Sequence, residues 1–128
     1  MDTIANMLTS LINAQRAGKQ RVAVPYSGIK ERLAQILQEK GFLSALRVQS
    51  GPKAKLVLTL AYDEKGQARI HGLKRISRPG QRWYVKKSRI PYSMDGMGCI
   101  VLSTPQGLMD DHKARKAGLG GEMICEIW

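Results

Sequence analysis

Histidine, cysteine and acidic residues are all scarce in this sequence. It contains two histidines, two cysteines and 10 aspartates and glutamates among 128 residues. Neither His71 nor His112 has a nucleophile and an orienting acid at a recognisable spacing, so we expect both to be surface or packing residues. The carboxylates and thiols are too scattered along the chain to predict a metal site. The sequence therefore predicts neither catalysis nor a metal or other cofactor.

Long apolar runs are missing as well. No segment approaches the ~20 apolar residues that span a membrane, and the first residues lack the pattern of a signal peptide. These absences predict a cytoplasmic or organellar protein with no membrane partner. Cys99 and Cys125 each fall within an apolar segment. Reduced thiols behave there as small hydrophobic side chains, so we expect both to be buried and free.

The charge is strongly one-sided. Lysines and arginines number 21, which gives a net charge of +11 and predicts a polyanionic partner. The excess is concentrated between residues 65 and 89, where no acidic residue occurs. The basic residues of this segment are Lys65, Arg69, Lys74, Arg75, Arg78, Arg82, Lys86, Lys87 and Arg89.

Two of the few aromatic residues lie inside this basic segment. Trp83 and Tyr84 follow Arg78-Pro79-Gly80-Gln81, which is typical of a turn. Cations neutralise phosphates and aromatic rings stack on bases, so the mixture favours nucleic acid. Neighbouring strand residues point to opposite faces, so we expect one ring to pack in a core and the other to be free for a ligand. No DNA-reading motif is present, which favours RNA.

The first helix is predicted from the helical spacing of its apolar residues. Asp2 is its expected cap, Gly18 ends the run, and Asn6 and Asn13 lie on the polar face. The apolar residues that define the opposite face are Ile4, Met7, Leu8, Leu11 and Ile12.

A short strand over 21–24 and a second helix follow. Ser27 is the expected cap of this helix and Gly41 lies past its end. Its periodicity predicts that Ile29 faces inward and Lys30 outward.

The rest of the chain is predicted to be mostly strands. Strands over 42–48 and 56–62 complete a first lobe, and the composition becomes strongly basic after residue 63. We therefore expect an α/β (α+β) protein of two small lobes. Residues 1–63 form an N-terminal α-β-α-β-β lobe, and residues 64–128 form a mostly β lobe with one short helix, which Asp110 caps and Gly118 ends.

Hydroxyl side chains mark the end of an apolar strand in the second lobe. Ile100 to Leu102 lead into Ser103 and Thr104, followed by a turn that ends at Gly107. Hydroxyls held at the end of a strand are expected to be exposed and to hydrogen-bond the sugars, phosphates or base edges of a partner.

A glycine-rich turn precedes the last strand. Gly118, Gly120 and Gly121 allow a close backbone approach, and the acceptor-only Glu122 follows them. The glycines match neither a phosphate-binding loop nor a dinucleotide fingerprint.

Two rival functions use the same basic character. A small enzyme or assembly factor acting on RNA would need a titrating site around His71 or His112. A basic partner of acidic proteins or membranes would show little preference between RNA folds. The acid-free basic segment beside a glycine-rich turn favours specific RNA binding over both.

Six blocks of the sequence, in order, resemble the bacterial-type small-subunit ribosomal protein eight family. They are Asp2-x-Ile-Ala-x-Met-Leu, Pro25-x-Ser27 before a helix with Lys30, Glu39-x-Gly41-Phe42-Leu43, Ser77-Arg78-Pro79-Gly80 with Arg82 and Tyr84, Gly98 to Gly107 with Ser103-Thr104, and Ala114-Arg115 through Gly118-x-Gly-Gly-Glu122. The chain departs from the family at Ile12, Gly28 and Pro105, where the family usually has Arg, Lys and a polar residue.

The resemblance implies a non-catalytic structural constituent of the small ribosomal subunit. Such a protein would bind a stem in the central domain of small-subunit ribosomal RNA, help assemble the platform, and border small-subunit proteins five and twelve as a monomer. Its place would be the cytoplasmic ribosome or an organellar one. The predicted RNA-binding residues are Asn6, Asn13, Lys30, Arg78, Arg82, Tyr84, Lys86, Lys87, Ser103, Thr104, Gly107, Arg115, Gly120, Gly121 and Glu122.

Overall fold

A computed structural model describes residues 3–128 of the protein. The chain divides into two compact units, of which unit 1 ends at Ile70 and unit 2 runs from His71 to Trp128. This division lies later than the boundary expected after residue 63. The chain turns at Asp63 and then pairs back onto unit 1, where the Arg69 N–H donates to the Ala61 carbonyl at 2.9 Å.

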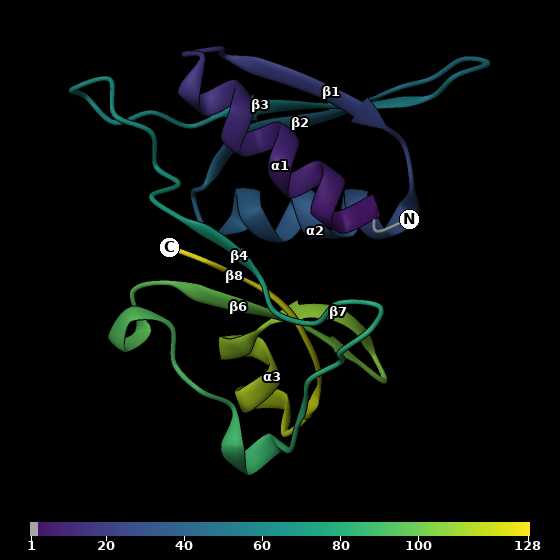
Figure 1. The fold of residues 1–128 in the computed structure, drawn as a ribbon, viewed down its shortest axis with the longest axis vertical. Coiled ribbons are helices and arrows are strands. Elements are labelled where there is room, and N and C mark those ends of the chain that lie inside the picture. The colour runs from purple at the N-terminus through teal and green to yellow at the C-terminus, as the bar shows by residue number, and fades with distance from the viewer. Residues whose placement is uncertain (1–2) are drawn as a thin grey trace. The chain divides into compact units, whose positions relative to one another are not determined.

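Unit 1 has the expected α-β-α-β-β order and combines two helices with a three-stranded antiparallel sheet (Figure 1). The strand order in this sheet is β1-β3-β2. The elements are α1 (Thr3–Arg16), β1 (Arg21–Pro25), α2 (Gly28–Glu39), β2 (Leu43–Gln49) and β3 (Lys55–Leu60).

The amphipathic character of α1 is confirmed. Asn6 and Asn13 are exposed, and Gly18, with a φ of 69°, follows the end of the helix. The predicted cap, Asp2, lies outside the described residues. The buried side chains of α1 are Ile4, Met7, Leu8, Leu11 and Ala14.

The predicted cap of α2 is confirmed, but its predicted faces are partly wrong. The Ser27 hydroxyl accepts from the Lys30 N–H at 3.2 Å. Lys30 is 5% exposed, whereas Ile29 is 44% exposed. The buried stripe contains residues 30, 33, 34 and 37, the helical spacing i, i+3, i+4 and i+7, so Lys30 occupies its first position. Its aliphatic stem can cover apolar surface near the helix end.

Unit 2 is built on an antiparallel sheet of order β4-β8-β6-β7, with the short β5 also paired to β8. The predicted cap and end of its helix are confirmed: Asp110 accepts from the Lys113 N–H, and Gly118 is left-handed. The elements are β4 (Leu73–Arg75), β5 (Tyr84–Val85), η1 (Lys87–Arg89), η2 (Met94–Gly96), β6 (Cys99–Thr104), β7 (Gly107–Asp110), α3 (Asp111–Ala117) and β8 (Gly121–Ile127).

The core of unit 2 lies between the sheet and α3. Ile100, Leu102 and Ala114 are buried together there with Ile90. Both units thus combine helices with antiparallel strands, which confirms the α+β class. None of the helices within residues 3–128 is long and apolar enough to cross a membrane.

The prediction that one aromatic side chain of the basic segment packs in a core is wrong. Trp83 is 49% exposed and Tyr84 is 65% exposed. Trp83 lies just outside β5, which has only two residues, so the strict alternation of a strand does not apply to this pair. Both rings are available to a ligand.

The two cysteines are buried and are not joined in a disulfide, as expected. Burial raises the pKa of the Cys125 thiol, because the thiolate is disfavoured away from water. We therefore expect both thiols of the native protein to resist iodoacetamide at pH 8 and to react once the protein is unfolded in urea. Mass spectrometry of the alkylated chain measures this, and rapid alkylation without urea would contradict the buried placement.

Candidate nucleic-acid interface

The hydroxyl pair at the end of β6 is part of a tight hairpin. β6 and β7 are joined through Pro105 and Gln106, and Gly107 has a φ of 107°, which favours glycine. The Thr104 hydroxyl donates to the Gly107 carbonyl at 2.8 Å and accepts from the Gln106 N–H at 3.1 Å.

Thr104 is therefore placed differently from the prediction. It is 9% exposed, although the end of a strand was expected to leave it open. Its hydroxyl forms hydrogen bonds within the hairpin and thereby stabilises the conformation of the turn. Ser103, the preceding residue, is half-buried and has the opposite side-chain direction.

Ser103, Glu122 and Tyr84 form a row across three strands. Ser103 on β6 is the register partner of Glu122 on β8, and Glu122 is the partner of Tyr84 on β5. Residues directly opposite in antiparallel strands point to the same face, so the three side chains are neighbours. We call these three residues the cross-strand row.

Arg82 joins the cross-strand row through its charge. Its Nε lies 3.7 Å from Oε2 of Glu122, whose side chain is 18% exposed. Hydrogen bonding with Tyr84, and then the Glu122 charge, raise the pKa of Arg82. The row thus offers a hydroxyl, a phenol, a carboxylate and a cation on one rigid surface, a combination suited to backbone and base-edge contacts.

The atoms that approach Gly120 and Gly121 closely belong to neighbouring strands of the protein. A Cβ added at Gly121 would lie against the Ser103 carbonyl oxygen, and one at Gly120 against the Val85 carbonyl oxygen. These glycines therefore allow β8 to pair closely with β6 and β5. They position Glu122 rather than leaving open backbone for a ligand.

The predicted basic contacts of unit 2 other than Arg82 fall into two groups. Arg78, Lys86 and Lys87 are exposed and can meet phosphates. Arg115 is instead occupied within the protein: its Nη1 lies 2.7 Å from Oδ2 of Asp111, and its guanidinium stacks at 3.6 Å on the Tyr92 ring. With its side chain only 18% exposed, Arg115 holds the fold of unit 2.

The other predicted contacts belong to unit 1. Asn6 and Asn13 are exposed on α1, where they can meet a ligand, but Lys30 is buried. Within unit 2, the structure brings together Ser103, Glu122, Tyr84 and Arg82, with Thr104 and Gly107 in the adjoining hairpin.

A second basic surface on unit 1 escaped prediction. Register places Arg21, Arg47 and Lys55 on the same face of the three-stranded sheet, opposite the buried Leu56, Leu58 and Leu60. All three cations are exposed, and no acidic residue occupies that face of the described strands. The alternation of apolar and polar residues over 56–60 indicated that one face of this strand is exposed. The pairing of the strands was needed to place Arg21 and Arg47 on the same face as Lys55.

The carboxylates are not as scattered as the sequence indicated. Asp110, Asp111 and His112 bring ligand-type atoms within 4.8 Å of one another at the start of α3. Asp110 accepts from the Lys113 N–H and Asp111 from the Ile100 N–H, so both carboxylates have structural partners.

Excess positive charge together with a preformed row of hydroxyl and carboxylate groups is a combination typical of RNA-binding proteins. Residues 2–128 match the family model of ribosomal protein S8. The chain belongs to this family, whose members are structural components of the small ribosomal subunit and not enzymes.

Relatives that are each named small ribosomal subunit protein uS8 match nearly end to end. The protein of Rubrobacter xylanophilus is 44% identical, with 99% of this chain and 97% of the relative covered. That of Sorangium cellulosum is 46% identical, covering 99% and 98%. That of Halothermothrix orenii is 43% identical, covering 99% and 97%. The family resemblance identified from the sequence is thereby confirmed.

Proposed function

We propose that this protein binds a stem in the central domain of small-subunit ribosomal RNA and helps to assemble the platform of the subunit. The cross-strand row carries this proposal, because it places Ser103, Glu122 and Tyr84 on one preformed face of unit 2. A rigid set of polar groups needs little ordering upon binding, which favours discrimination between RNA folds. Membership of the S8 family supports the same ligand.

The proposed contacts divide into two kinds. Arg78, Lys86 and Lys87 are exposed and neutralise phosphates, which supplies affinity that depends on salt. Ser103 and Glu122 contact sugars or base edges and supply the preference for one RNA. Thr104 acts indirectly, because its hydroxyl fixes the hairpin beside them.

We further propose that the protein works as a monomer in cytoplasmic bacterial ribosomes, where it borders small-subunit proteins five and twelve. Family membership supports a ribosomal setting with RNA and protein neighbours. Chemical crosslinking of purified small subunits tests this: we expect crosslinks from this chain to both neighbours. Crosslinks only to other proteins would overturn it.

Replacing Glu122 with alanine should weaken binding to the cognate stem by about 1–3 kcal/mol, because an acceptor for RNA donors is lost. The same change releases Arg82 from its partner at 3.7 Å, so binding to a scrambled duplex should stay equal or become tighter. Filter-binding titrations of both RNAs at two salt concentrations measure the two effects.

The matched control is Glu64→Ala, which removes an exposed acid from the turn of unit 1 and changes the net charge equally. It should change binding to the cognate stem and to the scrambled duplex equally. Equal losses on both RNAs for Glu122→Ala would contradict a role in specificity. Lys86→Ala should instead weaken binding to both RNAs and reduce the salt dependence of the binding constant by about one counterion.

A further inference from the structure

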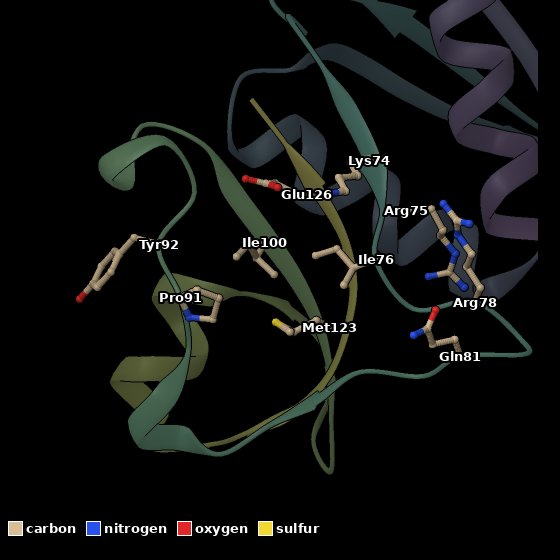
Figure 2. A pocket seen from close by; sticks show the side chains of 10 residues that line it. All are labelled: Lys74, Arg75, Ile76, Arg78, Gln81, Pro91, Tyr92, Ile100, Met123 and Glu126. Carbon is tan, nitrogen blue, oxygen red and sulfur yellow. The ribbon is translucent and has the colours of Figure 1, made fainter.

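Unit 2 contains a pocket that the cross-strand row does not use. It has a volume of about 410 Å³, within the usual range for small-ligand sites of ~300–1,000 Å³. Figure 2 shows that the side chains of Ile76, Ile100 and Met123 gather at its floor. All three belong to the apolar cluster of unit 2, but Ile76 and Met123 remain partly exposed.

This floor suits a flat ring. Ile76 and Ile100 come from β4's continuation and from β6, and Met123 comes from β8, so the apolar surface is built on a paired sheet. A thioether such as that of Met123 makes favourable contacts with aromatic rings. Pro91 and Tyr92 also line the pocket, and Figure 2 shows Pro91 beside this floor while the Tyr92 ring points away from it.

The rim of the pocket is polar and mainly cationic. Lys74 on β4 and Arg78 and Gln81 at the two ends of the turn after it line the pocket, and all three are exposed. Glu126 is the acidic residue of the lining, and its Oε2 accepts from the Ser93 hydroxyl at 2.6 Å. The rim therefore offers positive charge and one side-chain amide beside an apolar floor.

We propose that this pocket takes one unpaired nucleotide of the bound RNA, a proposal that rests on the function proposed above. The base lies on the floor, the Gln81 amide donates to and accepts from its edge, and Lys74 and Arg78 meet its phosphate. A nucleotide carries a flat ring and an anion a short distance apart, and these complement the apolar floor and the cationic rim. An apolar peptide side chain would use the floor but leave the cations without a partner.

The first test uses the full chain with ¹³C-labelled isoleucine and methionine methyl groups, titrated with adenosine 5′-monophosphate. The methyl resonances of Ile76, Ile100 and Met123 should shift with the nucleotide and not with inorganic phosphate. Arg78→Ala should weaken nucleotide binding about fivefold or more, whereas Arg69→Ala, which removes an exposed cation of unit 1, should leave it unchanged.

The absence of shifts at these methyl groups with millimolar nucleotide would overturn the proposal at this stage. If an acidic peptide carrying an aromatic residue then shifts the same methyl groups, the pocket belongs to a protein partner instead.

The second test uses the cognate stem with and without its unpaired nucleotides. Gln81→Ala leaves the charge unchanged, and it should weaken binding to the complete stem about fivefold or more while sparing the fully paired stem. Gln67→Ala is the matched control, because that side chain is exposed on unit 1. If Gln81→Ala binds both stems as the unaltered protein does, the pocket proposal fails and the proposed function stands. If the unaltered protein prefers neither stem to a scrambled duplex, the proposed function itself fails.

Discussion

Replacing Asp111 with alanine should lower the free energy of unfolding by about 3–5 kcal/mol, because a buried charge and a buried N–H both lose their partner. Asp111 is fully buried at the start of α3. Its Oδ1 accepts from the Ile100 N–H at 3.0 Å, and its Oδ2 lies 2.7 Å from Nη1 of Arg115. The carboxylate thus joins α3 to β6 and fixes the guanidinium that stacks on Tyr92.

Urea unfolding followed by tryptophan fluorescence measures this change directly. Both tryptophans, Trp83 and Trp128, lie in unit 2, so the signal reports the unit that contains Asp111. Asp111→Asn is the matched variant, since it keeps the shape and an oxygen acceptor while removing the charge, and its loss should be smaller.

A double-mutant cycle separates the ion pair from the hydrogen bond to the backbone. Asp111→Ala combined with Arg115→Ala should cost less than the sum of the single changes, because the double variant leaves no unpaired cation. Strict additivity, or a loss below about 1 kcal/mol for Asp111→Ala, would contradict the role assigned to this pair.

Local chemistry explains why several elements could be predicted from the sequence. Ser27 and Asp110 accept from backbone N–H groups three residues later, and Gly118 adopts the left-handed conformation that ends a helix. Each of these signals acts within one helical turn, so it can be identified without knowing the rest of the fold.

Features that depend on distant partners could not be predicted in the same way. Lys30 has the composition of a surface residue, but the stripe of α2 places it inward. β5 and β7 are short, and their residues become strands only because β8 and β6 supply partners. The return of the chain after Asp63 likewise depends on a hydrogen bond to Ala61. Because of this pairing, the boundary between the units lies after Ile70 and not after residue 63 as predicted.

The candidate site shows the same division. The sequence and its family resemblance identified Ser103, Thr104, Tyr84 and Glu122, but not that three of them share one row. The register between strands supplies that fact. The hydrogen bond from the Thr104 hydroxyl to the Gly107 carbonyl shows that this hydroxyl stabilises the hairpin. The ion pair with Asp111 likewise shows that Arg115 has a partner within unit 2. The sequence shows where polar residues occur, but it does not show which of them form hydrogen bonds or ion pairs within the protein itself.

Replacing Gly121 with alanine should lower the free energy of unfolding of unit 2 by about 2–4 kcal/mol, since backbone atoms must move to admit the methyl group. The added Cβ would meet the carbonyl oxygen and carbon of Ser103 and the Cα of Thr104. All three are backbone atoms of β6, so no side-chain rotation can relieve the contact. The pairing of β6 with β8 must therefore shift at the row that carries Ser103 and Glu122.

Gly80→Ala provides the matched control for this change. A Cβ at Gly80 has nothing within 4 Å, and the residue lies in an exposed turn without a left-handed φ. Its stability should stay within about 0.5 kcal/mol of the unaltered protein. Urea unfolding measures both variants, and equal stability would contradict the close approach of β6 and β8. Folded Gly121→Ala should also lose preference for the cognate stem, because specificity depends on the spacing of side chains that this glycine allows.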